Sequence, residues 1–175
     1  MQKFIMVGAL ACSGMLAGCL GGMASSGAER AEARLAPTQG NRVAGAVTFT
    51  QTGSKVRVIA EVSGLAPGAH GFHIHDKGDC SAPDGTSAGG HFNPGGKPHG
   101  NPEQAEHHAG DMPQLIANAA GVATMTAYLD GLTISEGANA IVGRSVIVHA
   151  APDDFKTQPT GNSGARQACG VIVRK

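Results

Sequence analysis

The sequence is poor in aromatic residues and has no net charge. Its 175 residues include no tryptophan, one tyrosine and five phenylalanines, and 13 basic residues balance 13 acidic ones. A core must therefore be built mainly from Val, Ile, Leu and Ala. Zero net charge gives no electrostatic reason to expect nucleic acid or an acidic membrane surface as a partner. The length suits one domain plus a tail, and 27 glycines predict frequent turns.

The N-terminal segment has the pattern of a targeting signal. Lys3 precedes an apolar or small run from Phe4 to Ala17, which is too short to span a bilayer comfortably. The run ends in "LAGC", residues 16–19, which resembles the lipobox of bacterial lipoproteins. This resemblance implies cleavage before Cys19 and lipid attachment to its thiol. The alternative is an ordinary secretory signal in which Cys19 is incidental.

Composition divides the chain into three parts. We expect residues 1–18 to be a lipoprotein signal peptide and residues 19–40 to be a flexible, lipid-anchored tether. The second part is small, polar and charged and lacks a sustained apolar period, so its stretch "AERAEARL" is expected to form at most a helical turn or two. Residues 41–175 are expected to form the folded domain.

Apolar residues recur with period two from residue 41 onward. "RVAGAVTFT" and "KVRVIAEVSGL" flank the turn "QTGS", and the side chains of Val56, Val58, Ala60 and Val62 share one face. Further strands are predicted at "HGFHIH", "QLIANAAGVATMTAYL", "SVIVHA" and "GVIV", with long polar loops over residues 76–113 and 152–170. This pattern predicts an all-β fold, an antiparallel β-sandwich or barrel with two long functional loops.

Four cysteines bear on the compartment. On the lipoprotein interpretation Cys12 leaves with the signal and Cys19 takes the lipid, which leaves Cys80 and Cys169. In an oxidising compartment this even pair either forms a disulfide or stays as two free buried thiols. Chain-entropy estimates give such a disulfide roughly 4–5 kcal/mol of stabilisation.

Histidines are the residues that point to chemistry. Residues i and i+2 of a strand face the same side, so His73 and His75 in "GFHIH" present two imidazoles toward one point. Neutral imidazole nitrogen is a good ligand for copper and zinc. Alone, such a pair is either two polar breaks in a strand or half of a metal site.

The long loop and a later strand supply further donors. His91, His99, His108 and Asp111 offer three nitrogens and one carboxylate oxygen, which make a tetrahedral zinc set. His149 ends the predicted strand "SVIV". If that strand neighbours the strand of the first histidine pair, it adds a nitrogen there, and four nitrogens in a tetragonal arrangement suit Cu(II).

Six motifs occur in an order that resembles the copper/zinc superoxide dismutase family, specifically its secreted bacterial kind. They are "GFHIH", "GGHFNP", "KPHG", "HAGD", "VIVHA" and "GNSGARQACGVI", and the resemblance runs from about residue 41 to residue 173. It implies a Greek-key antiparallel β-sandwich or barrel of about eight strands, and one copper and one zinc per chain. The implied copper ligands are His73, His75, His91 and His149, and the implied zinc ligands are His91, His99, His108 and Asp111.

The resemblance also assigns roles beyond the ligands. His91 would bridge the two metals and, with Arg166 beside the copper, would be catalytic. Asp153 matches the carboxylate that orients ligands of both metals. Cys80 and Cys169 match the family disulfide. The other two histidines, at positions 70 and 107, are expected to be a packing residue bonded to backbone and a solvated residue, respectively.

The implied activity is the disproportionation of superoxide to oxygen and hydrogen peroxide by alternating Cu(II) and Cu(I), as antioxidant defence in the cell envelope. Leu20 rather than Asp follows the lipidated Cys19, which by resemblance to lipoprotein sorting favours the outer membrane, on its periplasmic side. A homodimer is possible, and no nucleic-acid partner is expected. Two other interpretations remain: a metal-buffering or catalytically silent lipoprotein, and a purely structural envelope lipoprotein.

Overall fold

The structure is a computed structural model that describes Met1 and residues 27–175. The expected signal peptide, Cys19 and residues 20–26 of the expected tether lie outside the described residues, apart from Met1. Within the described part, no helix is long and apolar enough to cross a membrane.

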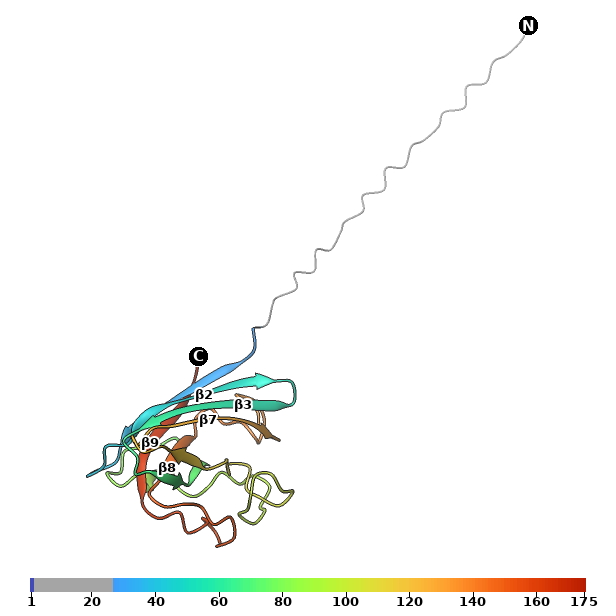
Figure 1. Cartoon of the computed structure of the whole chain (residues 1–175). Helices are drawn as coiled ribbons and strands as arrows, with labels where there is room; N and C mark the ends of the chain where they lie inside the picture. The colour runs from blue at the N-terminus through green and yellow to red at the C-terminus, as the bar shows by residue number, and fades with distance from the viewer. Residues whose placement is uncertain (2–26) are drawn as a thin grey trace.

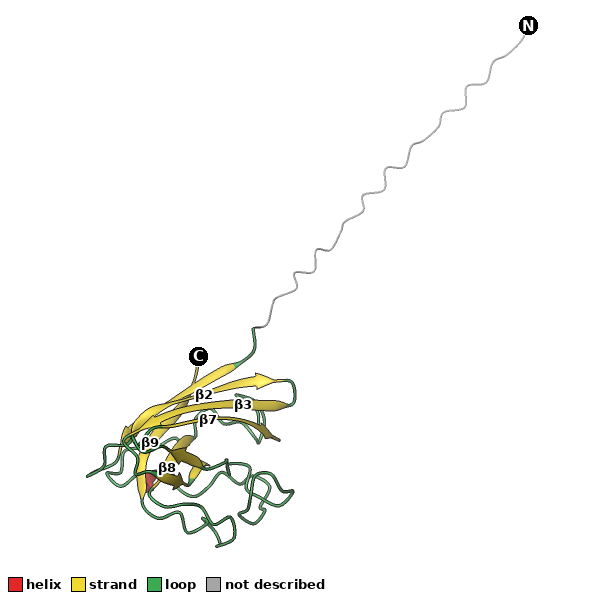
Figure 2. Ribbon diagram, viewed as in Figure 1, coloured by secondary structure: helices red, strands yellow, loops and turns green. Residues whose placement is uncertain are grey.

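Nine strands and one 3-10 turn make up the regular structure of the described residues (Figures 1 and 2). The strands are β1 (Arg30–Pro37), β2 (Ala44–Thr52), β3 (Lys55–Ser63), β4 (Gly68–His70), β5 (Phe72–His75), β6 (Leu115–Ala117), β7 (Ala123–Asp130), β8 (Ser145–His149) and β9 (Arg166–Arg174), and the 3-10 turn is η1 (Thr86–Ala88). The all-β prediction is confirmed, with one strand more than the eight expected.

Seven strands form one antiparallel sheet in the order β5-β8-β9-β1-β2-β3-β7, and β4 pairs with β6 in a second, small sheet. Neighbours that are distant in sequence, such as β5 and β8 or β3 and β7, are joined by the long connections of a Greek-key arrangement. Figure 2 shows the large sheet curling so that β8 and β9 lie across from β2, β3 and β7. The buried apolar side chains lie between these two parts.

Strand β1 corrects the expected domain boundary. Residues 30–37 are neither tether nor helical turn: they pair with β2 on one side and β9 on the other. Ala31, Ala33 and Leu35 are buried and alternate with Arg30 and Glu32. The apolar period of this segment is weak because two of its inward residues are alanine, and Ala, Glu and Arg favour helices. Strand pairing on both edges overrides that propensity, and the folded domain begins before residue 41.

The β2–β3 hairpin forms as predicted. Val56, Val58, Ala60 and Val62 are all buried on the core face of β3. The two strands are joined by a two-residue loop whose first residue, Gly53, has φ of +59°. Hairpin turns of this length need positive φ, which glycine adopts without strain.

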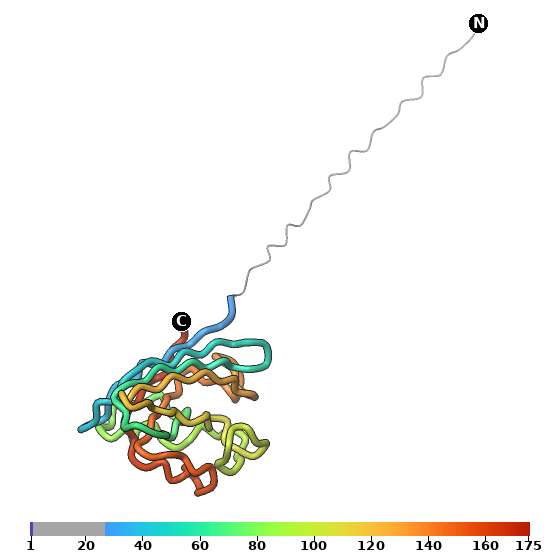
Figure 3. The backbone as a smooth tube through the Cα atoms, viewed as in Figure 1, coloured from blue at the N-terminus to red at the C-terminus, as the bar shows by residue number. Residues whose placement is uncertain are grey.

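Two long connections lie on the β5–β8 side of the barrel and carry little regular structure (Figure 3). The first follows β5 and runs to β6, with η1 as its one helical turn. The second joins β8 to β9 and ends at residue 165, five residues earlier than expected, because β9 already begins at Arg166. The first loop leaves from the strand that carries His73 and His75, and the second leaves from the strand that ends in His149.

Candidate metal centre

Strand β5 separates packing side chains from donor side chains. Phe72 and Ile74 are fully buried in the apolar core, and the rings of His73 and His75 lie on the other face. Strand β8 pairs directly with β5, and the backbone N–H of His149 donates to Gly71 O at 2.9 Å. The strand that ends in His149 therefore lies next to the strand of His73 and His75, which is the arrangement that would add a third nitrogen to this pair.

Four histidines converge on one point between β5, β8 and the first loop. Their candidate donor atoms all lie within 4.8 Å of one another, and all four residues are buried: His73, His75, His91 and His149. Four ring nitrogens are buried without a hydrogen-bond partner: His73 Nδ1, His75 Nε2, His91 Nε2 and His149 Nε2. Leaving four buried polar atoms unpartnered is costly, and a shared metal ion would satisfy all four at once. This donor set fits copper.

Hydrogen bonds at the opposite ring nitrogens set the tautomers. His75 donates from Nδ1 to Gly89 O at 2.9 Å, and His149 donates from Nδ1 to Gly164 O at 3.2 Å. His73 instead donates from Nε2 to a carboxylate at 2.6 Å. In each case the proton sits on the bonded nitrogen, so the lone pair of the other nitrogen faces the common point.

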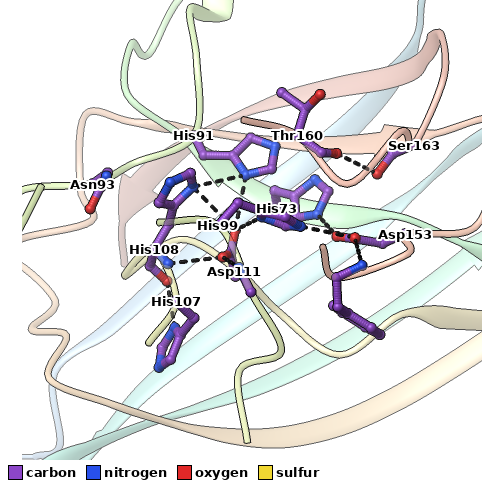
Figure 4. A network of polar contacts seen from close by, with 12 residues as sticks. His73, His91, Asn93, His99, His107, His108, Asp111, Asp153, Thr160 and Ser163 are labelled. Atoms are coloured by element: carbon purple, nitrogen blue, oxygen red, sulfur yellow. Dashed lines mark hydrogen bonds and ion pairs between the residues drawn. The ribbon is translucent and has the colours of Figure 1, made fainter. Parts of the chain in front are cut away.

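A second set lies beside the first and shares one residue with it. The candidate donor atoms of His91, His99, His108 and Asp111 also lie within 4.8 Å of one another. Asp111 Oδ1 is 2.9 Å from His91 Nδ1 and 3.1 Å from His99 Nδ1, and His108 Nδ1 is 3.3 Å from His91 Nδ1 (Figure 4). Three nitrogens and one oxygen fit zinc. His91 directs Nδ1 into this set and Nε2 into the other.

One carboxylate connects the two sets. Asp153 accepts a hydrogen bond from His73 Nε2 at Oδ2 and from His99 Nε2 at Oδ1, the latter at 2.9 Å. Gly161 closes against both groups: a Cβ at this position would lie 1.8 Å from Asp153 Oδ1 and 2.6 Å from His99 Nε2. Because Gly161 also has φ of +64°, a larger residue would be both strained and obstructed there.

Burial and neighbouring charges give the histidines of the two donor sets different pKa values. Burial lowers the pKa of His91 to about 4 and that of His149 to about 3, so both rings are neutral at neutral pH. Burial alone would lower the pKa of His99 too, but hydrogen bonds to Asp111 and Asp153 raise it to about 9. The pKa of Asp111 is held well below its usual value by hydrogen bonds from histidines, although burial opposes this. At neutral pH, His99 therefore carries a proton that a metal must displace.

Arg166 is fixed beside the first set by the loop that follows β5. Its Nη1 donates to Gly85 O and its Nη2 to Gly89 O, both at 2.7 Å. The predicted disulfide is confirmed, since Cys80 of this loop is bonded to Cys169 of β9. Burial lowers the pKa of Arg166, but from a value so high that the group stays charged at neutral pH.

The remaining two histidines lie outside both sets. His70 is buried, with Nδ1 2.8 Å from His149 O and Nε2 2.9 Å from Ala66 O, as expected for a packing residue bonded to backbone. His107 is half-buried rather than solvated, and its Nδ1 donates to His108 O at 2.6 Å.

The structure also brings in residues that the sequence did not single out. Gln114 accepts a hydrogen bond from the backbone N–H of Asp153, and Gln158 contacts the backbone of His99. Arg144 bonds Asp76 and stacks over Phe92, with its Cζ 3.5 Å from the ring centre. Nothing in a loop sequence marks a glutamine or arginine as a support for a distant histidine.

Comparison with known proteins agrees with this geometry. The chain is 47% identical over 137 residues to superoxide dismutase [Cu-Zn] 2 of Brassica juncea, covering 74% of this chain and 89% of that protein. It is 41% identical over 150 residues to the extracellular superoxide dismutase [Cu-Zn] of Caenorhabditis elegans, covering 82% of this chain and 65% of that protein. A family model described as copper/zinc superoxide dismutase matches residues 43–172.

The matched region contains both donor sets, Asp153, Arg166 and the disulfide. One donor set suited to copper and one suited to zinc correspond to the two metals in the description of this family. The chain belongs to the copper/zinc superoxide dismutase family.

Proposed function

We propose that this chain disproportionates superoxide at the set formed by His73, His75, His91 and His149, with zinc held by His91, His99, His108 and Asp111. One observation supports this most strongly. In the first set, four buried ring nitrogens lack any hydrogen-bond partner and lie within reach of a single ion. Copper supplies a centre that superoxide can reduce and then reoxidise, whereas zinc has one stable oxidation state.

His91 is the residue proposed to hold the proton. Its Nδ1 belongs to the zinc set, while its Nε2 is buried and faces the copper set without a protein partner. Its pKa of about 4 means that Nε2 does not hold a competing proton at neutral pH. A proton that Nε2 takes from solvent would be passed on readily to the peroxide product, because the low pKa disfavours keeping it, while the contacts at Nδ1 keep the ring in place.

Arg166 is proposed to bind the superoxide anion. The guanidinium is half-buried and charged, and two backbone carbonyls hold its terminal nitrogens in a fixed plane. His75 donates to Gly89 O, the same carbonyl that accepts from Arg166, so one backbone group places both residues. A positioned cation beside the copper set attracts and orients a small anion.

For the whole chain we propose the secreted bacterial lipoprotein form: residues 1–18 as signal peptide, Cys19 as lipid-bearing residue, and a tether from Cys19 to about residue 29. The Cys80–Cys169 disulfide supports an oxidising compartment. In Figure 1 the described chain begins on the side of the barrel away from the loop between β8 and β9, which leaves the metal centre free of a tether attached there. The proposed location is the periplasmic side of the outer membrane.

Mass spectrometry of the mature protein tests the anchor, because a first residue other than lipidated Cys19 would refute it. Pairing of two copies stays a prediction, which sedimentation velocity of the purified protein tests directly. No nucleic-acid partner is proposed.

One experiment tests the activity against a metal-buffering role. Metal content and superoxide consumption are measured for the wild type and for His149→Ala and Arg166→Ala. The enzyme hypothesis expects one copper and one zinc per chain, activity lost in His149→Ala, and activity reduced with metals retained in Arg166→Ala. Full metal loading without superoxide consumption in the wild type would instead establish a metal buffer.

A further inference from the structure

The side chain of Gln158 holds the backbone of His99 from both directions. Gln158 Oε1 accepts the backbone N–H of His99 at 2.8 Å, and Gln158 Nε2 donates to His99 O at 2.9 Å. The two residues are 59 positions apart and belong to different loops. A side-chain amide has one acceptor and two donors, so it can pair with both backbone groups of a residue as a neighbouring strand would.

The loop that carries Gln158 also holds the imidazole of His99. Asp153 accepts a hydrogen bond from His99 Nε2, and Gly161 packs against the same nitrogen. The backbone N–H, the backbone carbonyl and Nε2 of His99 are therefore all engaged by the β8–β9 loop. The remaining polar atom, Nδ1, is directed at Asp111 Oδ1, 3.1 Å away.

We propose that Gln158 is a positioning residue for the zinc set, which links zinc binding at His99 to the order of the β8–β9 loop that leads into Arg166. The inference rests on the proposed function, because it uses the assignment of His99 to zinc. We call the two hydrogen bonds from Gln158 to the His99 backbone the clamp. Linkage is reciprocal: if the clamp places His99 for zinc, then zinc binding in turn stabilises the loop through the clamp.

The clamp should matter because His99 is buried and its backbone groups have few other partners. His99 is only 3% exposed, but Gln158 is exposed, so without its amide the N–H and carbonyl of His99 would exchange two positioned partners for mobile water. Outer partners that orient metal ligands typically change metal affinity about 10–100-fold when they are removed. We expect an effect at the lower end, about tenfold, because Asp153 still holds Nε2.

Gln158→Met is the test variant, since methionine matches glutamine in length but offers neither the donor nor the strong acceptor. Gln104→Met is the matched control, because Gln104 is an exposed glutamine of the loop that carries His99. Gln158→Glu is the second variant. It keeps an acceptor for His99 N–H but sets a carboxylate oxygen against His99 O, so it should weaken zinc binding as well.

The full chain, freed of metal, is titrated with zinc against a chromophoric chelator, and separately with copper. The absorption spectrum of cobalt(II) in the zinc set reports its geometry. Hydrogen exchange of residues 150–165 is compared with and without zinc. We expect Gln158→Met to raise the zinc dissociation constant about tenfold, to alter the cobalt spectrum and to remove most of the zinc-induced protection of the loop. Copper binding and the control should match the wild type.

A zinc dissociation constant within twofold of wild type in both Gln158 variants would overturn the proposal. So would equal weakening of copper and zinc, since that indicates a general loss of structure. If Gln158→Met does not fold, Gln158→Glu carries the test. None of these measurements needs dismutase activity. A wild type that binds no zinc refutes the assigned set itself, whereas normal wild-type binding with unchanged variants refutes only the clamp.

Discussion

Asp153 accepts a hydrogen bond from His73 Nε2 at 2.6 Å, and its second oxygen accepts from His99 Nε2 at 2.9 Å. One buried carboxylate thus orients a histidine of each donor set. The pKa of Asp153 lies well below its usual value because the hydrogen bonds from His73 and His99 outweigh the opposing effect of burial. The carboxylate therefore stays ionised and can accept from both rings at once.

Replacing Asp153 with asparagine should loosen both metals. An amide has one oxygen and one NH2 group, so one of the two histidines would meet a donor where it now meets an acceptor. We expect the affinity for at least one metal to fall about 10–100-fold, measured by metal content after dialysis against a chelator. Asp130→Asn on the exposed outer end of β7 is the control. Unchanged retention of both metals in Asp153→Asn would contradict this role.

Zinc affinity should depend on pH more steeply than copper affinity. The pKa of His99 in the metal-free protein is raised to about 9, so between about pH 6.5 and 9 zinc must displace a proton from this ring. Affinity should then rise up to about tenfold per pH unit over that window. The pKa values of His149 and His91, about 3 and 4, place their protonation at much lower pH.

The same pKa shifts determine whether the folding stability of the metal-free protein rises or falls with pH. The raised pKa of His99 contributes stability that is full below about pH 6.5 and is lost as the pH rises through about 9. The lowered pKa values of His91 and His149 contribute the opposite: stability present above about pH 6.5 and lost as the pH falls toward 4 and 3. Protons compete with zinc at His99 already below about pH 9, but protonate His91 and His149 only near pH 4 and 3. Acid titration of the metal-loaded protein should for this reason release zinc before copper, and release in the reverse order would count against these assignments.

Reducing the disulfide should lower activity before it unfolds the barrel. Cys80 lies in the segment whose carbonyls at Gly85 and Gly89 hold Arg166, while Cys169 lies three residues after Arg166 on β9. Freed from Cys169, this segment can shift and release the guanidinium. The test compares superoxide consumption of reduced, metal-loaded protein with its circular dichroism. Full activity in a verified reduced sample would show that the disulfide does not position Arg166.

Gly161→Ala should impair the metal centre through contact with Asp153. The added Cβ would lie 1.8 Å from the carboxylate oxygen, at a backbone φ of +64° that alanine adopts only with strain. We expect a loss of at least about 1 kcal/mol in stability and weaker zinc retention. Gly131→Ala is a useful control, because it has a similar φ of +70° but open space around the Cβ position. Equal effects in both variants would assign the loss to backbone strain alone.

Much of the fold was readable from local pattern. The hairpin of β2 and β3 follows from strict alternation around a glycine turn, and Phe72 and Ile74 face the core opposite His73 as period two requires. Local pattern does not predict strand β1, because its inward side is mostly alanine, which has little apolar signal of its own. Its place between β2 and β9 depends on partners far away in the chain, and no local window contains them.

The sequence by itself determined the chemical nature of the site: which nitrogens and carboxylate oxygens are present, and that His73 and His75 share a face, because strand geometry repeats every two residues. Only the tertiary structure decided which ring nitrogen of each histidine stays free, since that depends on carbonyl groups such as Gly89 O and Gly164 O in distant loops. The clamp of Gln158 on His99 arose in the same way, since it forms only when folding brings two loops together.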